Sequence, residues 1–471
     1  MVEAGTQQCT QRRLLTLRDI CLRPAPNAQQ RRGHLHAGLY TDRAAGLDER
    51  TCDPERPPPG KRGPATPLER QVPSALPDGE PVPSSGALPD GALQGLGSRP
   101  FGLYVHVPFC ASRCGYCDFN TYLGSELGGG ALQTSYADAV VHELRLARRV
   151  LGPDAPAVDT VFVGGGTPTL LPARDLVRVL TAVRDEFGLA PDAEVTTEAN
   201  PDSVDERYLA ELRAGGFTRV SFGMQSAVSS VLAVLDRTHT PGRPAEVAKA
   251  AYCAGFEQVS LDLIYGTPGE SEHDWAASLD AVRSVGPTHV SAYALIVEDG
   301  TRLGRQVARG LLPAPDDDVL ADRYLMADEA LQDLGWYEVS NWGEPCRHNL
   351  GYWLGGDWWG VGPGAHSHVG GIRWWNVKHP QAYADRLADE ASPGAGRERL
   401  SDEDRRVERV MLEVRLREGL PLDVLRPAGL IAASRHLDAG LLDLDAHAAG
   451  RAVVTLRGRL LADLVIRDLV D

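Results

Sequence analysis

Three cysteines stand close together in the segment YVHVPFCASRCGYCDFNTY, residues 104–122. They are Cys110, Cys114 and Cys117, so the spacing is C-x3-C-x2-C, and Phe119 follows two places after the last of them. A cubane iron–sulfur cluster normally takes four cysteine ligands. With three, one iron would have no protein ligand and could bind a small molecule. The spacing therefore favours a [4Fe–4S] cluster with one iron open to a substrate-like ligand.

A zinc ion and a disulfide are the alternatives for these thiols. Structural zinc usually takes four ligands in two separated pairs. His106 could complete a zinc site, but an extended strand would place it more than about 10 Å away along the chain. The odd number of thiols in the loop disfavours disulfides, and eight cysteines without a signal peptide fit a reducing cytosol. A zinc-stabilised barrel with a structural role remains the alternative of a different class.

Length and charge narrow the class of protein. The 471 residues suffice for two or three domains with a sizeable core. A net charge of −16 argues against nucleic acid as the main partner, because phosphate backbones attract basic surfaces. No apolar run approaches the roughly 18–20 residues of a membrane span. We therefore expect a cytoplasmic, soluble protein.

The first hundred residues differ in composition from the rest. They hold 14 of the 33 prolines and show little hydrophobic periodicity, which predicts a disordered extension over residues 1–98. The stretch QRRLLTLRDICLR could be an amphipathic targeting helix. We favour instead an over-extended gene start, with Val72 as the true initiator. Three further cysteines, Cys9, Cys21 and Cys52, would then have no part in the chemistry.

The elements that must position the cysteines alternate regularly from residue 101 to about residue 295. Short β-rich runs are separated by helix-patterned segments of ten to eighteen residues, which is typical of parallel βαβ units. The expected strands are 102–107, 159–165, 193–199, 218–224, 257–266 and 288–295. Six units predict an α/β fold, a partial (β/α)6 barrel over residues 99–335, with its chemistry at the C-terminal ends of the strands.

Unusual residues follow these strands at that same end. The cysteine loop follows the first strand and GGGTP, residues 164–168, follows the second. Glu198 ends the third strand, Gln225 follows the fourth, and Asp262 lies near the end of the fifth. Each is a weak signal alone, since a glycine-rich turn is commonly just a tight connection. Their joint placement on one rim indicates a ligand site.

A C-x3-C-x2-C loop after the first strand of such a barrel resembles the radical S-adenosylmethionine (SAM) superfamily. The segments YVHVPFC, YCDFNTY, VFVGGGTPTLL, RVSFGMQS and SLDLIYGTPG together resemble the oxygen-independent coproporphyrinogen III oxidase group, from about residue 100 onward. The resemblance implies that the three cysteines hold a [4Fe–4S] cluster and that SAM chelates its open iron. By the matching motifs, the residues that would contact SAM are Tyr104, Gly165, Gly166, Thr167, Glu198, Gln225, Arg237, Asp262 and Ala294. The alternative for Arg237 and Asp262 is a surface ion pair.

A second motif lies in the segment EVSNWGEPCRHNLGYWLGGDWWGVGPGAHSH, residues 338–368. It resembles the HNxxYW phrase of the HemW-type heme chaperones, carried here by His348, Asn349, Tyr352 and Trp353. Aromatic walls suit a flat apolar macrocycle, and imidazole is a common axial ligand of heme iron. The resemblance implies heme contact by these four residues, with His348 at the iron. The alternative is an aromatic-rich interface in which His348 donates a hydrogen bond.

Other axial ligands and the function stay open at this stage. His366, His368 and Cys346 are alternatives to His348 as the ligand of the heme iron. The resemblance implies a heme chaperone that binds the cluster, SAM and heme and delivers heme to an acceptor apoprotein, plausibly a respiratory one. The alternative is an oxygen-independent coproporphyrinogen III dehydrogenase. Those enzymes carry a fourth cysteine where this chain has Phe119, and an N-terminal extension that residues 1–100 do not resemble.

The remaining expectations concern organisation and partners. Residues 336–398 are interpreted as a heme-binding connecting region, and residues 399–471 as a small C-terminal domain of helices with a short β element. We assign the C-terminal domain no chemistry and name no catalytic residue. Peripheral contact with a membrane, and a monomer or a homodimer, are both compatible with the sequence.

Overall fold

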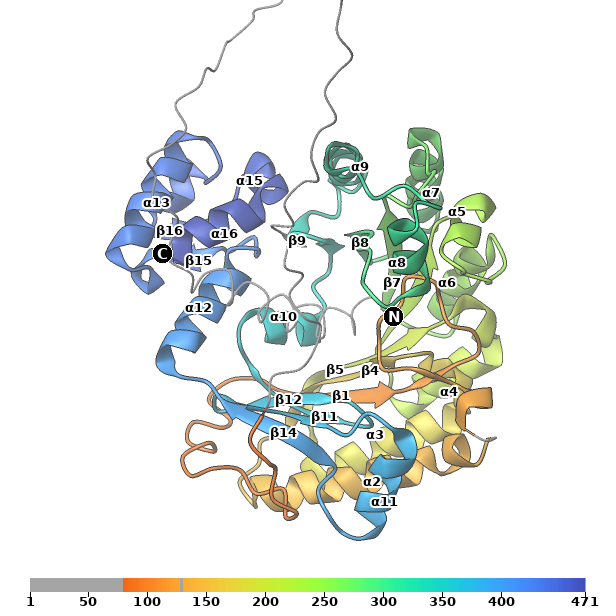
Figure 1. Ribbon diagram of the computed structural model, residues 1–471. Helices are drawn as coiled ribbons and strands as arrows, with labels where there is room; N and C mark the ends of the chain where they lie inside the picture. Colours follow the sequence, from red (N-terminus) through yellow and green to blue (C-terminus); the bar gives the residue numbers. More distant parts are fainter. Residues whose placement is uncertain (1–78, 128–129, 471) are drawn as a thin grey trace, which may run out of the picture.

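The computed structural model describes residues 79–127 and 130–470 (Figure 1). The expectations for residues 1–78, including Val72 and the three N-terminal cysteines, lie outside the described residues. Within residues 79–98 the chain packs against the sheet: Glu80 and Arg397 exchange backbone hydrogen bonds of 2.7 and 2.9 Å. The Ser392 amide donates to the Ser84 carbonyl at 2.7 Å. The disordered extension predicted to residue 98 is therefore too long, because an exposed strand edge pairs with this segment.

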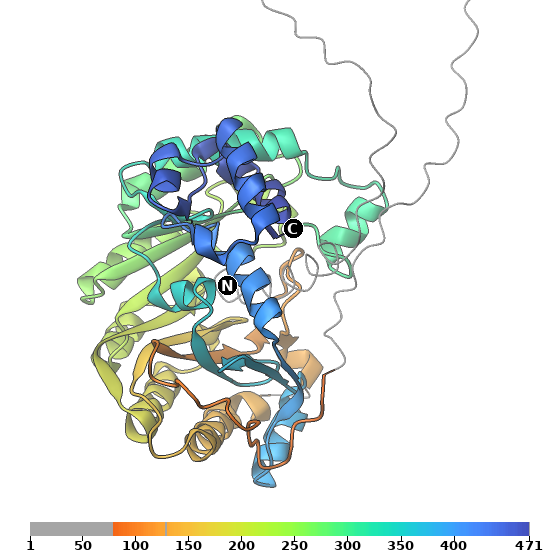
Figure 2. The same ribbon diagram turned by 90° about the vertical axis from the view of Figure 1, so that its left-hand side faces the viewer.

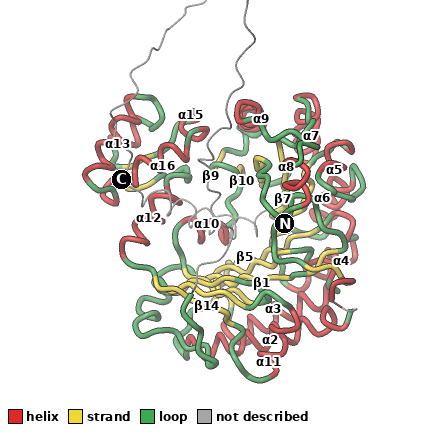
Figure 3. Tube along the Cα trace, viewed as in Figure 1, coloured by secondary structure: helices red, strands yellow, loops and turns green. Residues whose placement is uncertain are grey.

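Six parallel strands form the centre of a twelve-stranded sheet. They are β1 (Phe101–Val107), β4 (Val158–Gly165), β5 (Leu189–Ala199), β6 (Arg219–Gln225), β7 (Gln258–Tyr265) and β8 (His289–Ala294). Each pairs with the next in chain order, as βαβ units require. All six expected strands are confirmed, and the barrel is open because its sheet ends at two different edge strands (Figure 3).

Helices connect these strands along the outer side of the curved sheet (Figure 2). They are α2 (Ala131–Leu151), α3 (Ala173–Phe187), α4 (Glu206–Gly215), α5 (Ser229–Val234), α6 (Arg243–Cys253) and α7 (Glu272–Val285). The apolar stripes of these helices, α5 excepted, pack on alternate strand residues such as Leu103, Val161 and Leu261, which are fully or almost fully buried. This layer is the main hydrophobic core.

Many of the intervening strand residues are polar and equally buried, although Phe162 and Ile264 lie among them. Ser221 on β6 donates to both carboxylate oxygens of Asp262 on β7, at 3.0 Å each. Glu198 and Asp262 have no exposed surface. Because successive strand side chains point to opposite faces, this set lines the inner side of the barrel. A polar interior suits a polar ligand better than an apolar one.

The second half of the chain extends both edges of the same sheet. Strand β11 (Asp357–Val361) pairs in parallel with β1 and is followed outward by β12 (His366–Val369), β13 (Ile372–Asn376) and β14 (Gly394–Arg399). Strands β10 (Asn341–Gly343) and β9 (Trp336–Glu338) continue the sheet beyond β8. The helices here are α8 (Arg302–Ala308), α9 (Asp317–Ala330), α10 (Arg347–Trp353) and α11 (Pro380–Ala388). The boundary predicted at residue 336 therefore divides one continuous sheet, because pairing between distant strands leaves no local sequence signal.

The last part of the chain has a core of its own. It comprises α12 (Asp402–Glu413), β15 (Leu420–Pro421), α13 (Pro427–Asp438), α14 (Leu444–Ala448), β16 (Arg451–Ala452), α15 (Leu456–Leu460) and α16 (Ala462–Val470). Val410, Ile466 and Leu469 are fully buried in that core, and Trp353 of α10 joins them. The expectation of helices with a short β element is confirmed. Among the described residues, no helix is both long and apolar enough to span a membrane.

Candidate functional site

The cysteine loop is closed at its base by two short strands. Strand β2 (Phe109–Cys110) pairs in parallel with β3 (Tyr122–Leu123), and the Tyr122 amide donates to the Pro108 carbonyl at 2.7 Å. Inside the loop, the Cys117 amide donates to the Cys114 carbonyl at 3.2 Å. The three cysteines therefore project from one short loop that follows β1, at the carboxyl ends of the strands. We call this the cysteine end of the barrel.

Cys110 and Cys114 are buried, and Cys117 is half-buried. Burial raises the pKa of Cys110 to about 11 and that of Cys117 to about 12, and the neighbouring Cys114 adds to both shifts. A bound metal reverses this effect, since coordination removes the thiol proton. In residues 79–127 and 130–470, no three His, Cys, Asp or Glu side chains are placed to share one metal ion. A cubane cluster does not need such a set, because each cysteine binds a different iron.

The glycine-rich turn after β4 lies directly against this loop. The amide of Gly166 donates to the Val107 carbonyl and that of Thr167 to the Phe109 carbonyl, both at 2.7 Å. A Cβ on Gly166 would stand 2.5 Å from the Phe109 oxygen and 3.0 Å from the Cys110 sulfur. Glycine is therefore required there for the two loops to approach each other.

Glu198 and Gln225 extend the site to the next two strands. A carboxylate oxygen of Glu198 accepts the Gly165 amide at 3.0 Å. Gln225 has a φ of 63°, a left-handed conformation that is strained for a residue with a Cβ. Its side-chain nitrogen and oxygen are both buried and have no hydrogen-bond partner. A strained residue with an unpaired buried amide is an arrangement that a bound ligand would relieve.

Arg237 and Asp262 are buried, so their interpretation as a surface ion pair is wrong. Arg237 follows α5 and is 6 % exposed, and Asp262 is fully buried. The Arg237 guanidinium donates to the Gly223 carbonyl at 2.9 Å and to the Cys114 sulfur at 3.7 Å. Ala294, the last residue of β8, is partly buried. Six of the nine residues expected to contact SAM lie at the carboxyl ends of strands or in the turns that follow them: Gly165, Gly166, Thr167, Glu198, Gln225 and Ala294. Asp262 lies in the second half of β7, and Arg237 reaches the cysteine end from the turn after α5.

Tyr104 is the ninth residue expected to contact SAM. It lies in the middle of β1, and its hydroxyl contacts His106. The Tyr104 hydroxyl is 2.9 Å from His106 Nδ1, and His106 Nε2 is 3.0 Å from the Asn120 carbonyl in the cysteine loop. A carbonyl only accepts, so Nε2 carries the proton and the tyrosine hydroxyl donates to Nδ1. Burial lowers the pKa of His106 to about 4, which keeps the ring neutral. His106 therefore supports the loop, and both of its ring nitrogens are occupied by hydrogen bonds and not by a metal.

The HNxxYW motif lies at the opposite end of the barrel. Helix α10 lies across the amino-terminal halves of β1 and β4 (Figure 1). We call this end of the barrel the α10 end. His348 Nδ1 is 2.7 Å from the Thr160 hydroxyl, and Nε2 is 2.7 Å from the Tyr352 hydroxyl. His348 and Asn349 are 3 % and 2 % exposed, and Tyr352 and Trp353 are 7 % exposed. In this conformation none of the four offers an open face to a macrocycle.

The other axial candidates differ in exposure. Cys346 is fully buried, and its thiol lies 3.5 Å from a carboxylate oxygen of Glu194. His368 is 6 % exposed, with Nδ1 2.7 Å from the Gly356 carbonyl. His366, at the start of β12, is only half-buried and stacks on the Trp375 ring, with centroids 6.0 Å apart. Of the three, His366 is the one that is not fully buried.

Sequence comparisons decide the family. A profile of the radical SAM superfamily matches residues 104–282. The chain is 54 % identical over 406 residues to "Heme chaperone HemW" of Mycobacterium tuberculosis, an alignment that covers 85 % of this chain and 99 % of the relative. The chain belongs to the HemW family. The HemW protein of Escherichia coli is 35 % identical over 294 residues, which cover 60 % of this chain and 75 % of the relative.

The fold is shared with a known enzyme of the same superfamily. The structure of coproporphyrinogen III oxidase HemN from Escherichia coli superposes with a TM-score of 0.67 at 23 % identity, covering 80 % of this chain and 92 % of the enzyme. This likeness shows the fold alone. Membership of the radical SAM superfamily implies a [4Fe–4S] cluster and SAM, and the buried thiols and the unpaired Gln225 amide at the cysteine end fit both.

Two residues that contact the predicted site residues were missed by the sequence reasoning. Glu194 accepts the backbone amides of Arg347 and His348, at 3.0 and 3.1 Å, and so fixes α10 in the barrel. His239 Nδ1 accepts from Arg237 Nε at 3.1 Å. The only available signal for His239 was its place two residues after Arg237 in LDRTH, whereas nothing local indicated the role of Glu194.

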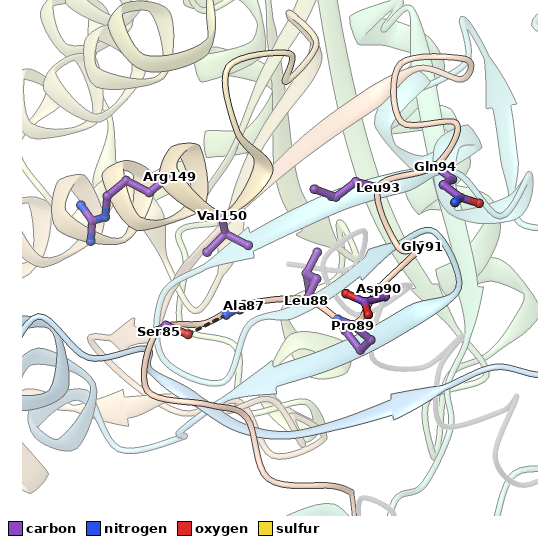
Figure 4. A pocket seen from close by; sticks show the side chains of 10 residues that line it. All are labelled: Ser85, Ala87, Leu88, Pro89, Asp90, Gly91, Leu93, Gln94, Arg149 and Val150. Atoms are coloured by element: carbon purple, nitrogen blue, oxygen red, sulfur yellow. Dashed lines mark hydrogen bonds between the residues drawn. The ribbon is translucent and has the colours of Figure 1, made fainter.

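A hollow lies away from the cysteines. Its volume is about 730 Å³ (Figure 4). The residues that line it are Ser85, Ala87, Leu88, Pro89, Asp90, Gly91, Leu93, Gln94, Arg149 and Val150. Arg149 and Val150 end α2, which runs from the cysteine end back toward the amino ends of the strands. The hollow therefore belongs to the packing of the N-terminal segment and contains none of the predicted site residues.

Proposed function

We propose that this protein is a heme chaperone that holds a [4Fe–4S] cluster and SAM at its cysteine end and passes heme to an acceptor protein. The observation that carries the proposal is the 54 % identity to a heme chaperone over 99 % of that protein's length. Phe119, in the place of a fourth cysteine, supports it against porphyrinogen decarboxylation. We place this exchange in the cytoplasm, where thiols stay reduced.

The proposed cluster ligands are Cys110, Cys114 and Cys117. SAM would then lie against the backbone of Gly165 and Gly166, where the absence of side chains permits close approach. Its polar groups would find the unpaired amide of Gln225 and the buried carboxylate of Glu198. When bound, SAM supplies a ligand to the open iron and a sulfonium that a reduced cluster can cleave. The protein's own contribution is to position these groups and to exclude water.

Heme binding through His348 requires a local rearrangement. Coordination of iron needs a free imidazole nitrogen, but the Tyr352 hydroxyl occupies Nε2 and the Thr160 hydroxyl occupies Nδ1. We propose that α10, seven residues long, shifts when heme enters and that Tyr352 then releases Nε2. His366 stays the alternative ligand, since it is partly exposed and has the Trp375 ring beside it.

The decisive experiment is a heme titration. Anaerobically reconstituted protein, and its His348→Ala and His366→Ala variants, would be titrated with hemin while the Soret band is recorded. We expect a shifted Soret band for the wild type and a changed or lost band for His348→Ala. No shift in the wild type, or a wild-type spectrum in both variants, would remove the proposed heme site.

Transfer and the competing activity need separate assays. Heme-loaded protein mixed with a heme-free respiratory cytochrome should lose its Soret signature as the cytochrome gains its own. Coproporphyrinogen III incubated with protein, SAM and reductant should yield no protoporphyrinogen IX at a catalytic rate. Formation of that product would instead establish the dehydrogenase. Sedimentation of the loaded protein would distinguish a monomer from a homodimer.

A further inference from the structure

Three of the contacts of Arg237 hold it at the cysteine end. One terminal nitrogen donates to the Gly223 carbonyl at 2.9 Å, and the other donates to the Cys114 sulfur at 3.7 Å. The Nε nitrogen donates to His239 Nδ1 at 3.1 Å. A Cβ on Gly223 would stand 2.9 Å from the guanidinium, so a glycine makes the space for it. The planar fork is therefore fixed in orientation as well as in position.

The contact with Arg237 fixes the tautomer of His239. An arginine has only donors, so His239 Nδ1 must be the unprotonated, accepting nitrogen. The neutral ring then carries its proton on Nε2, which is buried and has no hydrogen-bond partner. Burial lowers the pKa of His239 to about 4, with the charge of Arg237 as the next cause, so the ring is neutral at physiological pH. The edge that faces Arg237 is thus an acceptor at all relevant pH values.

We propose that His239 is a positioning residue of the cofactor site, whose Nδ1 orients the Arg237 guanidinium so that it donates to the sulfur of the cluster ligand Cys114. The proposal rests on the proposed function, because it concerns the cluster that these cysteines would hold. Hydrogen bonds to cluster sulfurs stabilise the reduced, more negative state and so raise the reduction potential. His239 thereby affects the ease of cluster reduction without touching the cluster.

Two substitutions of His239 distinguish the role of its Nδ1 from that of its Nε2. His239→Asn can keep an acceptor near the place of Nδ1 and removes the Nε2 donor. His239→Gln reaches the place of Nε2 and removes the acceptor for Arg237. His273→Gln, on the exposed surface of α7, is the matched control. Cluster content and melting temperature are measured first, and His239→Leu replaces the glutamine variant if that variant holds no cluster.

The readout is the midpoint potential of the reconstituted cluster, followed by electron paramagnetic resonance. His239→Gln should lower the equilibrium constant for reduction about tenfold, a shift of about 59 mV for one electron. His239→Asn and His273→Gln should match the wild type. Equal shifts in both His239 variants, the reverse order, or no shift in either would overturn the proposal.

A double variant tests whether His239 acts through Arg237. Arg237→Lys keeps the charge but loses the fork that Nδ1 orients. In that background His239→Gln should cause no further shift, whereas additive shifts would contradict action through Arg237. A wild-type protein that takes up no cluster would contradict the proposed function and this inference together. A wild-type cluster with one potential in all variants would contradict the inference alone.

Discussion

Two buried histidines, His239 at the cysteine end and His348 at the α10 end, are bonded in different ways. At the cysteine end, His239 has one ring nitrogen on Arg237 and the other unpaired, and the amide of Gln225 is unpaired altogether. At the α10 end, both nitrogens of His348 are bonded to hydroxyl groups. Unpaired buried polar groups cost about 1–3 kcal/mol each. The cysteine end therefore keeps buried polar groups without protein partners, whereas both nitrogens of the His348 imidazole at the α10 end are bonded within the protein.

The α10 end also contains buried polar groups without hydrogen-bond partners. Asn349 Oδ1 and Trp353 Nε1 at the α10 end also lack partners. Both belong to the HNxxYW motif, and Trp353 packs into the core of the C-terminal domain. A shift of α10 would expose these two groups together with His348 Nε2. The same motif can thus be closed in this conformation and still supply polar contacts after a rearrangement.

The largest expected effect is the loss of the cluster at the cysteine end. Cys114→Ala should reduce iron and inorganic sulfide to background after anaerobic reconstitution, because two thiolates do not retain a cubane. Cys253→Ala, at the exposed end of α6, is the matched control and should keep the wild-type content. Iron and sulfide assays measure both. Full cluster content in Cys114→Ala would contradict the assignment of the cluster to the cysteine end, and with it the contrast between the two ends.

Replacing Gln225 should raise the stability of the protein and weaken its binding of SAM. Gln225→Gly relieves the left-handed backbone, which costs about 1 kcal/mol, and removes an unpaired amide. We expect a higher urea midpoint and SAM affinity at least about tenfold weaker, a loss of about 1.4 kcal/mol. Glu390→Gly, an exposed residue with a φ of 56°, should gain stability while SAM binding stays unchanged. A stabilised Gln225→Gly with normal SAM binding would remove this residue from the site.

At the α10 end, the large effect should be on folding. His348→Ala leaves the Thr160 and Tyr352 hydroxyls unpaired and opens a cavity, so we expect the free energy of unfolding to fall by about 3 kcal/mol. His366→Ala, at a half-buried position, should cost less than about 1 kcal/mol. Urea denaturation of the cluster-free proteins measures both. Equal losses would show that the burial of His348 does not distinguish the two positions.

A further expected effect concerns the pH dependence of stability. The folded pKa of His106 is about 4, below the unfolded value of 6.5, so the unfolded chain binds the proton more readily. The stabilisation is present above pH 6.5 and is lost as pH falls toward 4, by about 2 kcal/mol at pH 5. Urea midpoints between pH 5 and pH 8 should show this slope, and His106→Gln should flatten it. An unchanged slope would place the acid sensitivity on another group.

Local patterns were sufficient for much of the fold. The six central strands and the C-terminal helices were predicted because apolar periodicity and turn residues are properties of neighbouring positions. The pairing of β11 with β1 was not, since residues 357–361 meet residues 101–105 only through long-range hydrogen bonds. The same limit explains why the segment 79–98 was interpreted as disordered. Its partner strand is β14, about three hundred residues later in the chain.

For the site, the amino-acid sequence alone determined the ligand chemistry: three thiols at close spacing, glycines beside them, and polar residues at the strand ends. Only the tertiary structure decided which groups are already bonded to one another. In the folded protein both nitrogens of His348 are hydrogen-bonded to hydroxyl groups. His239 contacts Arg237, which in turn contacts the Cys114 sulfur. The reason is physical, because residue type limits what a side chain can bind, whereas burial and neighbours determine which of those bonds the protein itself has already made.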